Sequence, residues 1–284
     1  WFQVGAFETV IARADWPSLE CRVEANVDAI LALFDEAGVK ATFFTLGWIA
    51  ERHPAMMRRI AQAGHEIASH GYDHQRAFTL DRKTFGEDIA RTRAILEDTS
   101  GSRVVGYRAP SFSIDARNPW AFEELAAQGY AYSSSVAPVV HDHYGWPQAP
   151  RFAFRPVAGS DLVELPVTTA MLGGRRVAAG GGGFFRVLPY SFSRWALAQV
   201  NREEARPGIF YFHPWEIDPA QPRVADAPMR SRLRHYTGLD RMADKLRRLA
   251  NDFRWGRMDE IAAQEAQRTV TGPADAGGEQ RIAA

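Results

Sequence analysis

His70 and His74, two histidines separated by three residues, have the types and spacing in this sequence that most directly suggest chemistry. They follow a short strand-like run at residues 66–69. Two neutral imidazoles on one turn are able to hold a divalent metal ion. A histidine pair in a turn is commonly only a pair of polar residues, but the position at a strand end favours the metal interpretation.

Two further polar residues end apolar, strand-like segments. Arg108 precedes Ala109 and Pro110, and the proline holds Ala109 extended, so the strand exits in a fixed direction. A buried arginine there needs a carboxylate partner, and an exposed arginine at a strand end is an equal alternative. His213 follows an apolar run and precedes Pro214. A structural role and a role in proton transfer are both open for it.

Other histidines and glycines give weaker signals. The stretch from His65 to His70 is close to a zinc-protease motif, but it has three residues, rather than two, between Glu66 and the second histidine. We therefore predict a structural role for His65, which faces away from His70 on a strand. The cluster His141-Asp142-His143 is a poor metal clamp, so it contacts substrate or is a plain loop. The run Gly180–Gly183 lacks the ending of a phosphate loop and predicts a flexible turn near the mouth of the fold.

Strand-like and helical segments alternate along the chain. Apolar residues spaced four, three and four apart, followed by Gly38, predict a helix over residues 23–34. Alternation of this kind implies parallel βα units, and therefore a barrel or an open doubly wound sheet. In such folds the strand ends that precede the candidate residues gather at one mouth. The predicted strands are 40–46, 66–69, 104–107, 130–133, 162–167 and 209–212, and the later predicted helices are 54–60, 85–96, 120–127, 195–201 and 239–253.

Composition limits the class of protein. The chain has 284 residues, 46% of them hydrophobic, which suits one large α/β domain with or without a small appendage. Its 34 basic residues balance 34 acidic ones, so charge gives no reason to expect nucleic acid or an anionic membrane. No apolar run approaches the roughly 18 residues of a membrane span. The single cysteine, Cys21, excludes an intrachain disulfide. The aromatic residues suit sugar rings, although core packing also explains them.

Several segments, taken together, resemble the polysaccharide deacetylase family, with nodulation-type chitooligosaccharide deacetylase homology (carbohydrate esterase family four). Its hallmark segments are similar to residues 40–44, 64–74 and 106–113. A narrower subfamily, associated with bacterial exopolysaccharide and exosortase clusters, is similar at residues 1–4, 212–218 and 234–238. The resemblance covers residues 1–258, with the subfamily's C-terminal extension from about residue 140. Residues 259–284 lack an apolar period, and we predict that they form a disordered tail.

The resemblance implies a fold and an activity. The fold is α/β, a distorted (β/α) barrel, often seven-stranded, that here lacks its first strand. The activity is that of a metal-dependent hydrolase that removes N-acetyl groups from the amino sugars of a polysaccharide or oligosaccharide. Two alternatives stay open: a catalytically degenerate member that binds glycan without hydrolysing it, and a metal-dependent amidohydrolase of a small cyclic amide.

The resemblance also implies roles, residue by residue. His70 and His74 would hold a divalent metal, usually zinc, although two imidazoles, a carboxylate and water suit several first-row metals. Arg108 would orient the catalytic base, and His213 would be the general acid. The backbone N–H near Ser111 would help to form the oxyanion hole. The residues expected to contact the substrate are Trp215 and His143.

The chain departs from the family's pattern at two places. The family has an aspartate pair, one the metal ligand and one the base, in a segment that we expect just upstream of Trp1. We therefore expect residues 1–284 alone to be truncated and inactive. The family's Tyr-Asp-Ser-Ser segment reads Tyr132-Ser133-Ser134-Ser135, so Ser133 replaces the aspartate that supports the catalytic histidine. The start of the chain leaves the compartment, bacterial cytoplasm or periplasm, undecided.

Overall fold

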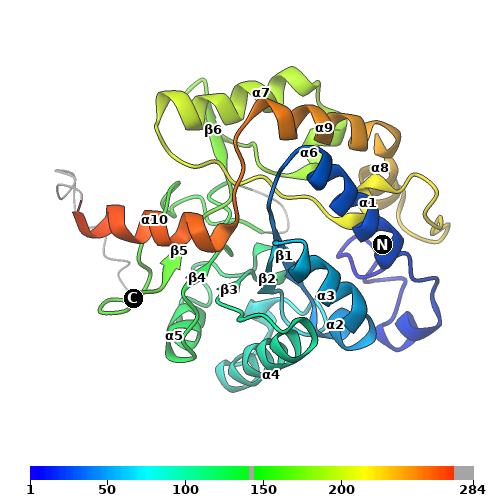
Figure 1. Ribbon diagram of the computed structural model, residues 1–284, viewed down its shortest axis with the longest axis horizontal. Helices are drawn as coiled ribbons and strands as arrows, with labels where there is room; N and C mark the ends of the chain where they lie inside the picture. Colours follow the sequence, from blue (N-terminus) through cyan, green and yellow to red (C-terminus); the bar gives the residue numbers. More distant parts are fainter. Residues whose placement is uncertain (141–143, 272–284) are drawn as a thin grey trace.

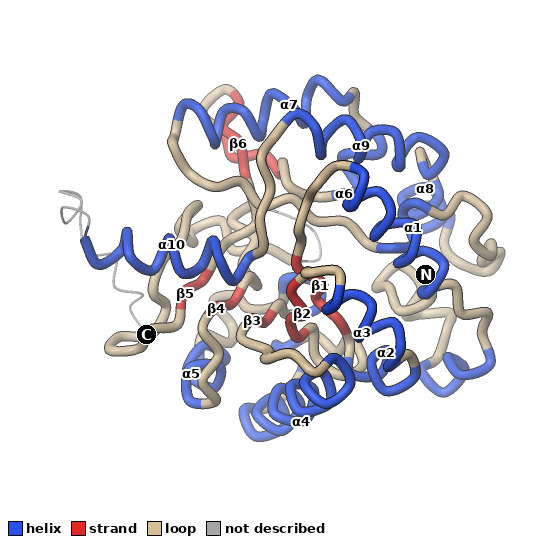
Figure 2. Tube along the Cα trace, viewed as in Figure 1, coloured by secondary structure: helices blue, strands red, loops and turns tan. Residues whose placement is uncertain are grey.

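A parallel β-sheet forms the centre of the molecule. The structure is a computed structural model that describes residues 1–140 and 144–271. Five parallel strands pair in chain order (Figures 1 and 2), which confirms the α/β prediction. A two-stranded antiparallel hairpin, β6–β7, follows them. The strands are β1 (Thr42–Thr45), β2 (Glu66–Ser69), β3 (Gly106–Tyr107), β4 (Tyr132–Ser133), β5 (Val163–Glu164), β6 (Thr169–Leu172) and β7 (Arg175–Ala178).

Helices cover the sheet on more than one side. Those that connect the first strands, α2 to α5, lie together below the sheet in Figure 1, and the group α6 to α9 lies above it. The helices are α1 (Val23–Glu36), α2 (Gly47–Arg52), α3 (Pro54–Gln62), α4 (Arg82–Ser100), α5 (Trp120–Ala127), α6 (Gly182–Val187), α7 (Tyr190–Ala198), α8 (Met229–Tyr236), α9 (Met242–Asp252) and α10 (Met258–Thr271). Shorter turns are η1 (Arg13–Ser18), η2 (Ala77–Thr79), η3 (Pro110–Phe112), the π-turn η4 (Gln199–Glu203), η5 (Pro214–Ile217) and η6 (Leu239–Arg241).

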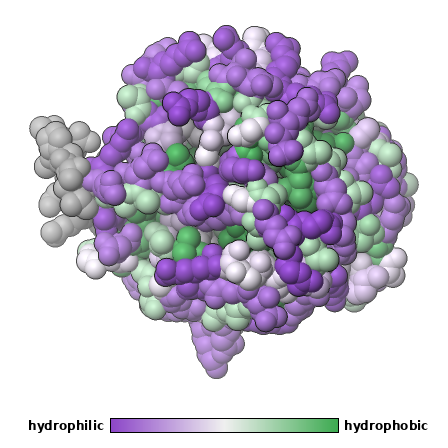
Figure 3. Space-filling view, viewed as in Figure 1, coloured by the Kyte–Doolittle hydropathy of each residue, from purple (hydrophilic) through white to green (hydrophobic). Residues whose placement is uncertain are grey.

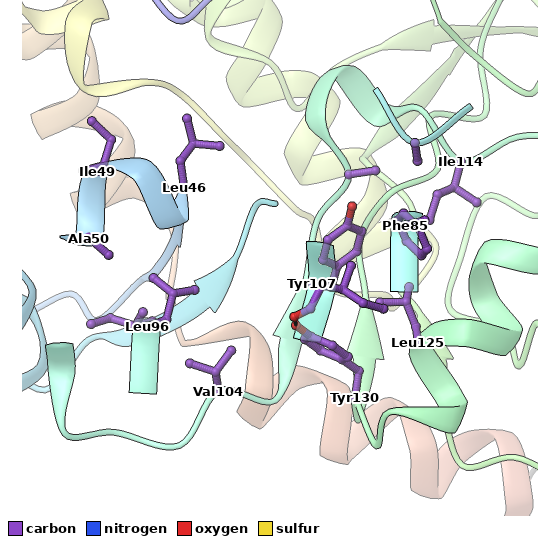
Figure 4. Close-up of a cluster of buried hydrophobic side chains, with 14 of the residues drawn as sticks. Leu46, Ile49, Ala50, Phe85, Leu96, Val104, Tyr107, Ile114, Leu125 and Tyr130 are labelled. Atoms are coloured by element: carbon purple, nitrogen blue, oxygen red, sulfur yellow. Dashed lines mark hydrogen bonds between the residues drawn. The ribbon is translucent and has the colours of Figure 1, made fainter. Parts of the chain in front are cut away.

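The main hydrophobic core lies between the sheet and helices α2, α4 and α5 (Figure 4). Tyr107 of β3 is at its centre, with ring centroids 5.8 Å from Phe85 of α4 and 6.0 Å from Tyr130. Phe85 and Leu96, two of the apolar residues used to predict α4, are completely buried. This packing fixes β3, and therefore the position at which the chain leaves it through Arg108.

The predicted strand at residues 209–212 is wrong. The segment makes one isolated parallel bridge, between Gly181 and Tyr211. The N–H of Tyr211 donates to the carbonyl of Gly180 at 2.7 Å, and that of Gly182 donates to the carbonyl of Tyr211 at 2.9 Å. The ladder cannot lengthen because α6 begins at Gly182. The predicted flexible turn at Gly180–Gly183 is therefore also wrong, since these glycines pair with residue 211 and begin a helix.

The predicted disordered tail is wrong as far as the structure describes it. Residues 258–271 form α10, which contacts β5 and lies beside it at the left of Figure 1. Ala262 is buried in a cluster with Tyr132, Val163 and Leu165. A helix with little apolar character is stable here because its few apolar side chains cover the sheet. Residues 272–284 lie outside the described part of the chain.

Hydrophilic side chains dominate one face of the molecule. The face shown in Figure 3 is mostly hydrophilic, and hydrophobic residues show in the recesses between elements. Within the described residues, no helix is both long and apolar enough to cross a membrane.

Candidate functional site

Strand pairing brings His70 next to Arg108. Ser69 and Tyr107, the last residues of β2 and β3, are partners in the sheet, so the two residues that follow them leave the sheet side by side. The Nδ1 atom of His70 lies 2.7 Å from the carbonyl oxygen of Arg108. A carbonyl only accepts, so Nδ1 carries the proton and Nε2 keeps its lone pair. A metal-ligating histidine is oriented in the same way by a backbone carbonyl.

His74 lies against His70 after a tight turn. The ring centroids of the two histidines are 5.3 Å apart, with an angle of 68° between the rings. His74 has a φ of 62°, in the left-handed region that non-glycine residues rarely adopt. Ser111 and Phe112 share this feature, with φ values of 57° and 50°. Such conformations cost about 1–3 kcal/mol each and concentrate at functional sites.

Electrostatics keep both rings neutral. Burial, followed by repulsion from His74, lowers the pKa of His70 well below its ordinary value. Burial, followed by repulsion from His213, lowers the pKa of His74 to about 3. His213 also acts on His70, so the structure brings the third histidine to the same place as the pair. A neutral imidazole is the form that binds a metal ion.

The donor set fits a divalent metal in part. Two neutral imidazoles are suitable ligands, and in His70 the carbonyl of Arg108 engages Nδ1 and leaves Nε2 available. Across residues 1–140 and 144–271, no group of three or more His, Cys, Asp or Glu side chains is placed to hold a metal ion. The described chain therefore offers two ligands, and the metal role of His70 and His74 stays a prediction.

Arg108 is buried, but a carboxylate does not hold it in the way the sequence suggested. Its guanidinium donates to the carbonyl oxygen of Ser134 at 3.0 Å and to the hydroxyl of Ser134 at 2.8 Å. It also lies over the ring of Phe44, 4.1 Å from the centroid. Burial lowers the pKa of Arg108 to about 10, and the field of Glu164 partly opposes that shift.

Ser133 belongs to a buried polar network behind the mouth. Its hydroxyl donates to the hydroxyl of Ser135 at 2.8 Å. The Oε1 atom of Glu164 accepts from the N–H groups of Ser135 and Val136, each at 2.8 Å. Burial raises the pKa of Glu164 to about 7. Among the hydrogen bonds of the described residues, none joins Ser133 to His213.

The carboxylate that contacts His213 is Glu216, which the sequence reasoning did not identify. The Nδ1 atom of His213 lies 2.8 Å from Oε1 of Glu216, and the backbone N–H of His213 donates to the same oxygen at 3.1 Å. The Oε2 atom accepts from Nε of Arg186 at 2.9 Å. Glu216 follows His213 by three residues and Pro214 begins η5, which together are the signal of a capping box.

Trp215, a predicted substrate contact, lies among histidines. Its ring is nearly parallel to that of His213, with centroids 5.7 Å apart, and stacks on His235 at 3.9 Å. The ring of Phe7 lies 4.5 Å from that of His235, so the N-terminal segment also reaches this stack. His143 lies outside the described residues.

The N-terminal segment borders the histidine pair. Arg13 forms an ion pair with Asp73 at 3.2 Å, next to His74 in the chain. Glu8 accepts from Arg76 at 2.8 Å. These contacts hold residues 1–18 beside the turn that carries His74. Glu8 is therefore paired with an arginine.

The chain matches two family models. Residues 15–132 match the model described as polysaccharide deacetylase. Residues 134–263 match a domain of unknown function, DUF3473. His70, His74 and Arg108 lie in the first part, and His213, Glu216 and Arg186 all lie in the second.

Curated relatives agree with the first match. A peptidoglycan deacetylase from Helicobacter pylori is 28% identical over 113 residues, which are 40% of this chain and 38% of the relative. A peptidoglycan-N-acetylglucosamine deacetylase from Bacillus cereus is 35% identical over 105 residues, which are 37% of this chain and 34% of the relative. The chain thus spans little more than a third of the length of these relatives.

Solved structures show the shared fold. One from Mycobacterium smegmatis, assigned as a polysaccharide deacetylase, has a TM-score of 0.57 at 24% identity and covers 90% of this chain and 82% of its own. Puue allantoinase has the same TM-score of 0.57 at 18% identity, over 88% of this chain and 74% of its own. Residues 15–132 of this chain are thus similar to polysaccharide deacetylases, both in the family model and in the curated relatives.

Proposed function

We propose that this protein is a metal-dependent hydrolase that removes N-acetyl groups from the amino sugars of a polysaccharide. The observation that carries the proposal is that His213 lies near His70 and His74, which are about 140 positions earlier in the chain. His70 and His74 lie with ring centroids 5.3 Å apart, and His213 is close enough to lower the pKa of each. Two neutral imidazoles beside a third histidine suit metal binding and acid catalysis at one mouth.

The first part of the site would hold the metal and the attacking water. His70 and His74 would be two ligands, and an aspartate encoded upstream of Trp1 would be the third. When bound, the metal, for which zinc is the first candidate, supplies a Lewis acid that polarises the acetyl carbonyl and acidifies a water. A second upstream aspartate would take the proton from that water. Arg108, buried beneath the mouth, would orient this base.

The second part of the site would complete the reaction. Attack of the water on the acetyl carbon gives a tetrahedral oxyanion, and the backbone N–H near Ser111 is the proposed donor to it. The left-handed backbone of Ser111 turns the chain at this point. His213, whose side chain is 44% exposed, would then protonate the leaving nitrogen as the C–N bond breaks. Acetate and the free amino sugar are the products.

Acetate release by full-length protein, including the residues upstream of Trp1, tests the proposal. N-acetylated chitooligosaccharides and peptidoglycan are suitable substrates, with zinc added. We expect turnover from the full-length protein and negligible turnover from residues 1–284. His213→Ala in the full-length protein should lower turnover by roughly 10²–10⁴ without changing the bound metal. Absence of acetate release from every glycan tested, with metal bound, would refute hydrolysis.

A second candidate is a glycan-binding protein without hydrolytic activity. It is favoured by Ser133, which replaces the family's aspartate, and by the two-ligand set of the described chain. Glycan binding without acetate release, measured by calorimetry on the same full-length protein, is the result that would support it.

A further inference from the structure

We propose that residues 134–263, the domain of unknown function, provide the general-acid unit of the site. In that unit, Glu216 positions the ring of His213, and Arg186 holds Glu216 in place. Glu216 takes the part that the resemblance gives to an aspartate at the position of Ser133. The inference rests on the proposed function because a general acid needs a leaving group to protonate. It goes beyond that function because it assigns a task to the second half of the chain.

Glu216 holds His213 by two points. Its Oε1 atom accepts from the ring Nδ1 at 2.8 Å and from the backbone N–H at 3.1 Å. A single oxygen thus fixes both the start of η5 and the rotation of the ring. Engagement of Nδ1 leaves Nε2 as the ring nitrogen that can face a substrate. A carboxylate in this place selects the tautomer of a catalytic histidine and stabilises its cationic form.

Arg186 holds the carboxylate in place. The side chains of Arg186 and Glu216 are each 2% exposed, and Nε of Arg186 lies 2.9 Å from Oε2 of Glu216. The other guanidinium nitrogens of Arg186 donate to the carbonyls of Arg234, His235 and Thr237, at 3.1, 2.9 and 2.6 Å. Three backbone carbonyls fix the orientation of the Arg186 guanidinium, which in turn fixes the carboxylate of Glu216. The donors and acceptors of this network all come from the same half of the chain.

The carboxylate remains charged. Burial acts to raise the pKa of Glu216, but the hydrogen bond and charge of His213 and the charge of Arg186 outweigh it, so that the pKa lies below its ordinary value. The charged or titratable groups that face His213 are Glu216 on its own element, the His70–His74 pair across the mouth, Tyr211, whose ring centroid lies 6.0 Å away, and His235. Glu216 is the only carboxylate among these described groups, so it is the one that can hold the ring by accepting from Nδ1.

The glycine run of α6 makes room for this arrangement. A Cβ atom on Gly182 would lie 2.4 Å from Oε2 and 2.7 Å from Oε1 of Glu216. The neighbouring Gly183 has nothing within 4 Å of such an atom. Gly182 therefore has a reason to be glycine that Gly183 does not share, and that reason is the carboxylate of Glu216.

The direct test is the tautomer of His213, read from its imidazole ¹⁵N shifts by NMR on residues 1–284. We expect the proton on Nδ1 in the native chain and a loss of that preference in Glu216→Gln. The matched control is Glu265→Gln, which removes another glutamate that is 2% exposed and paired with arginines, in α10. The control should leave the His213 signals unchanged. An unchanged tautomer in Glu216→Gln, in a folded variant, would overturn the positioning role.

Kinetics on the full-length protein complete the test. Glu216→Gln should lower kcat on the order of 10–100-fold and move the limb of the pH–rate profile that reports the acid to lower pH. Glu216→Asp should restore part of the rate because it keeps the charge. Gly182→Ala should lower kcat in the same way, and Gly183→Ala should not. If the native protein is active and the pH–rate profile of Glu216→Gln is unchanged, the role of Glu216 is refuted and the proposed function stands. Inactive native protein would refute the proposed function, and the NMR comparison would still decide whether Glu216 positions His213.

Discussion

The Nδ1 atom of His70 donates to the carbonyl oxygen of Arg108 across 2.7 Å, although the two residues are 38 positions apart. This bond joins the histidine pair to the arginine segment at the ends of β2 and β3. It fixes the tautomer that leaves Nε2 of His70 available as a ligand. The orientation of the His70 ring is thus fixed by the folded sheet.

The histidine pair should decide metal affinity. His70→Ala and His74→Ala should each weaken zinc binding by more than the roughly 10–100-fold that a change in an outer-shell partner costs, because each removes a proposed ligand. Calorimetry with zinc measures this. The control is His65→Gln: His65 is buried, and its Nδ1 accepts the N–H of Ala41 at 3.0 Å, away from the pair. That variant should lose stability but bind zinc normally. Unchanged affinity in both alanine variants would exclude the site.

Placing the family's aspartate in this chain should not raise activity. Ser133 is completely buried beside Glu164, and His213 already contacts Glu216. Ser133→Asp should therefore destabilise the fold by at least about 1–3 kcal/mol because a second carboxyl group enters a buried polar network. Denaturant unfolding, with Ser133→Ala as the comparison, checks this. A faster and equally stable Ser133→Asp variant would show that Glu216 does not serve His213.

Glu66 should make stability depend on pH. It is buried, and it accepts from the hydroxyls of Thr42 and Tyr132 and from the N–H of Asp259. Burial raises its pKa from 4.5 to about 7, so the folded state holds the proton more tightly than the unfolded state does. The stability from this proton is complete below pH 4.5 and is lost as the pH rises through about 7.

Glu66→Gln should remove that loss. In the native chain, the free energy of unfolding should fall between about pH 4.5 and 8 as Glu66 loses its proton. In the variant, this fall should be smaller by on the order of 3 kcal/mol. Urea unfolding at several pH values measures the difference. The exposed Glu87→Gln on α4 is the control and should keep the native slope. Identical slopes for Glu66→Gln and the native chain would contradict the buried, protonated state.

The terminal helix should matter for stability. Ala262 is 4% exposed against β4 and β5, whereas its neighbour Ala263 is exposed. Ala262→Glu should destabilise the fold by about 1–3 kcal/mol or more because it buries a carboxyl group. Ala263→Glu should change the free energy of unfolding by less than about 0.5 kcal/mol. Thermal or denaturant unfolding checks both. Equal stability of the two variants would show that residues 259–271 do not pack on the sheet.

The sequence predicted those features that depend only on residues close together in the chain. The pair His70 and His74 lies within one turn, and the strand-like run before it forms β2, so local sequence placed both residues after a strand end. The alternation of apolar segments likewise predicted the parallel sheet, because side-chain periodicity depends on neighbours in the chain. His65 was predicted to be structural, and it is buried with its Nδ1 accepting the N–H of Ala41.

Tertiary structure decided what depends on distant partners. Residues 209–212 are strand-like in composition, but a strand also needs a partner that can extend a ladder, and the start of α6 ends that ladder. Residues 259–271 have little apolar period, but the sheet covers the few apolar side chains that α10 has. Glu216 is near His213 in sequence, yet its charge is held by Arg186, thirty residues earlier. Burial and long-range pairing depend on the whole chain, so composition and spacing could not place these groups.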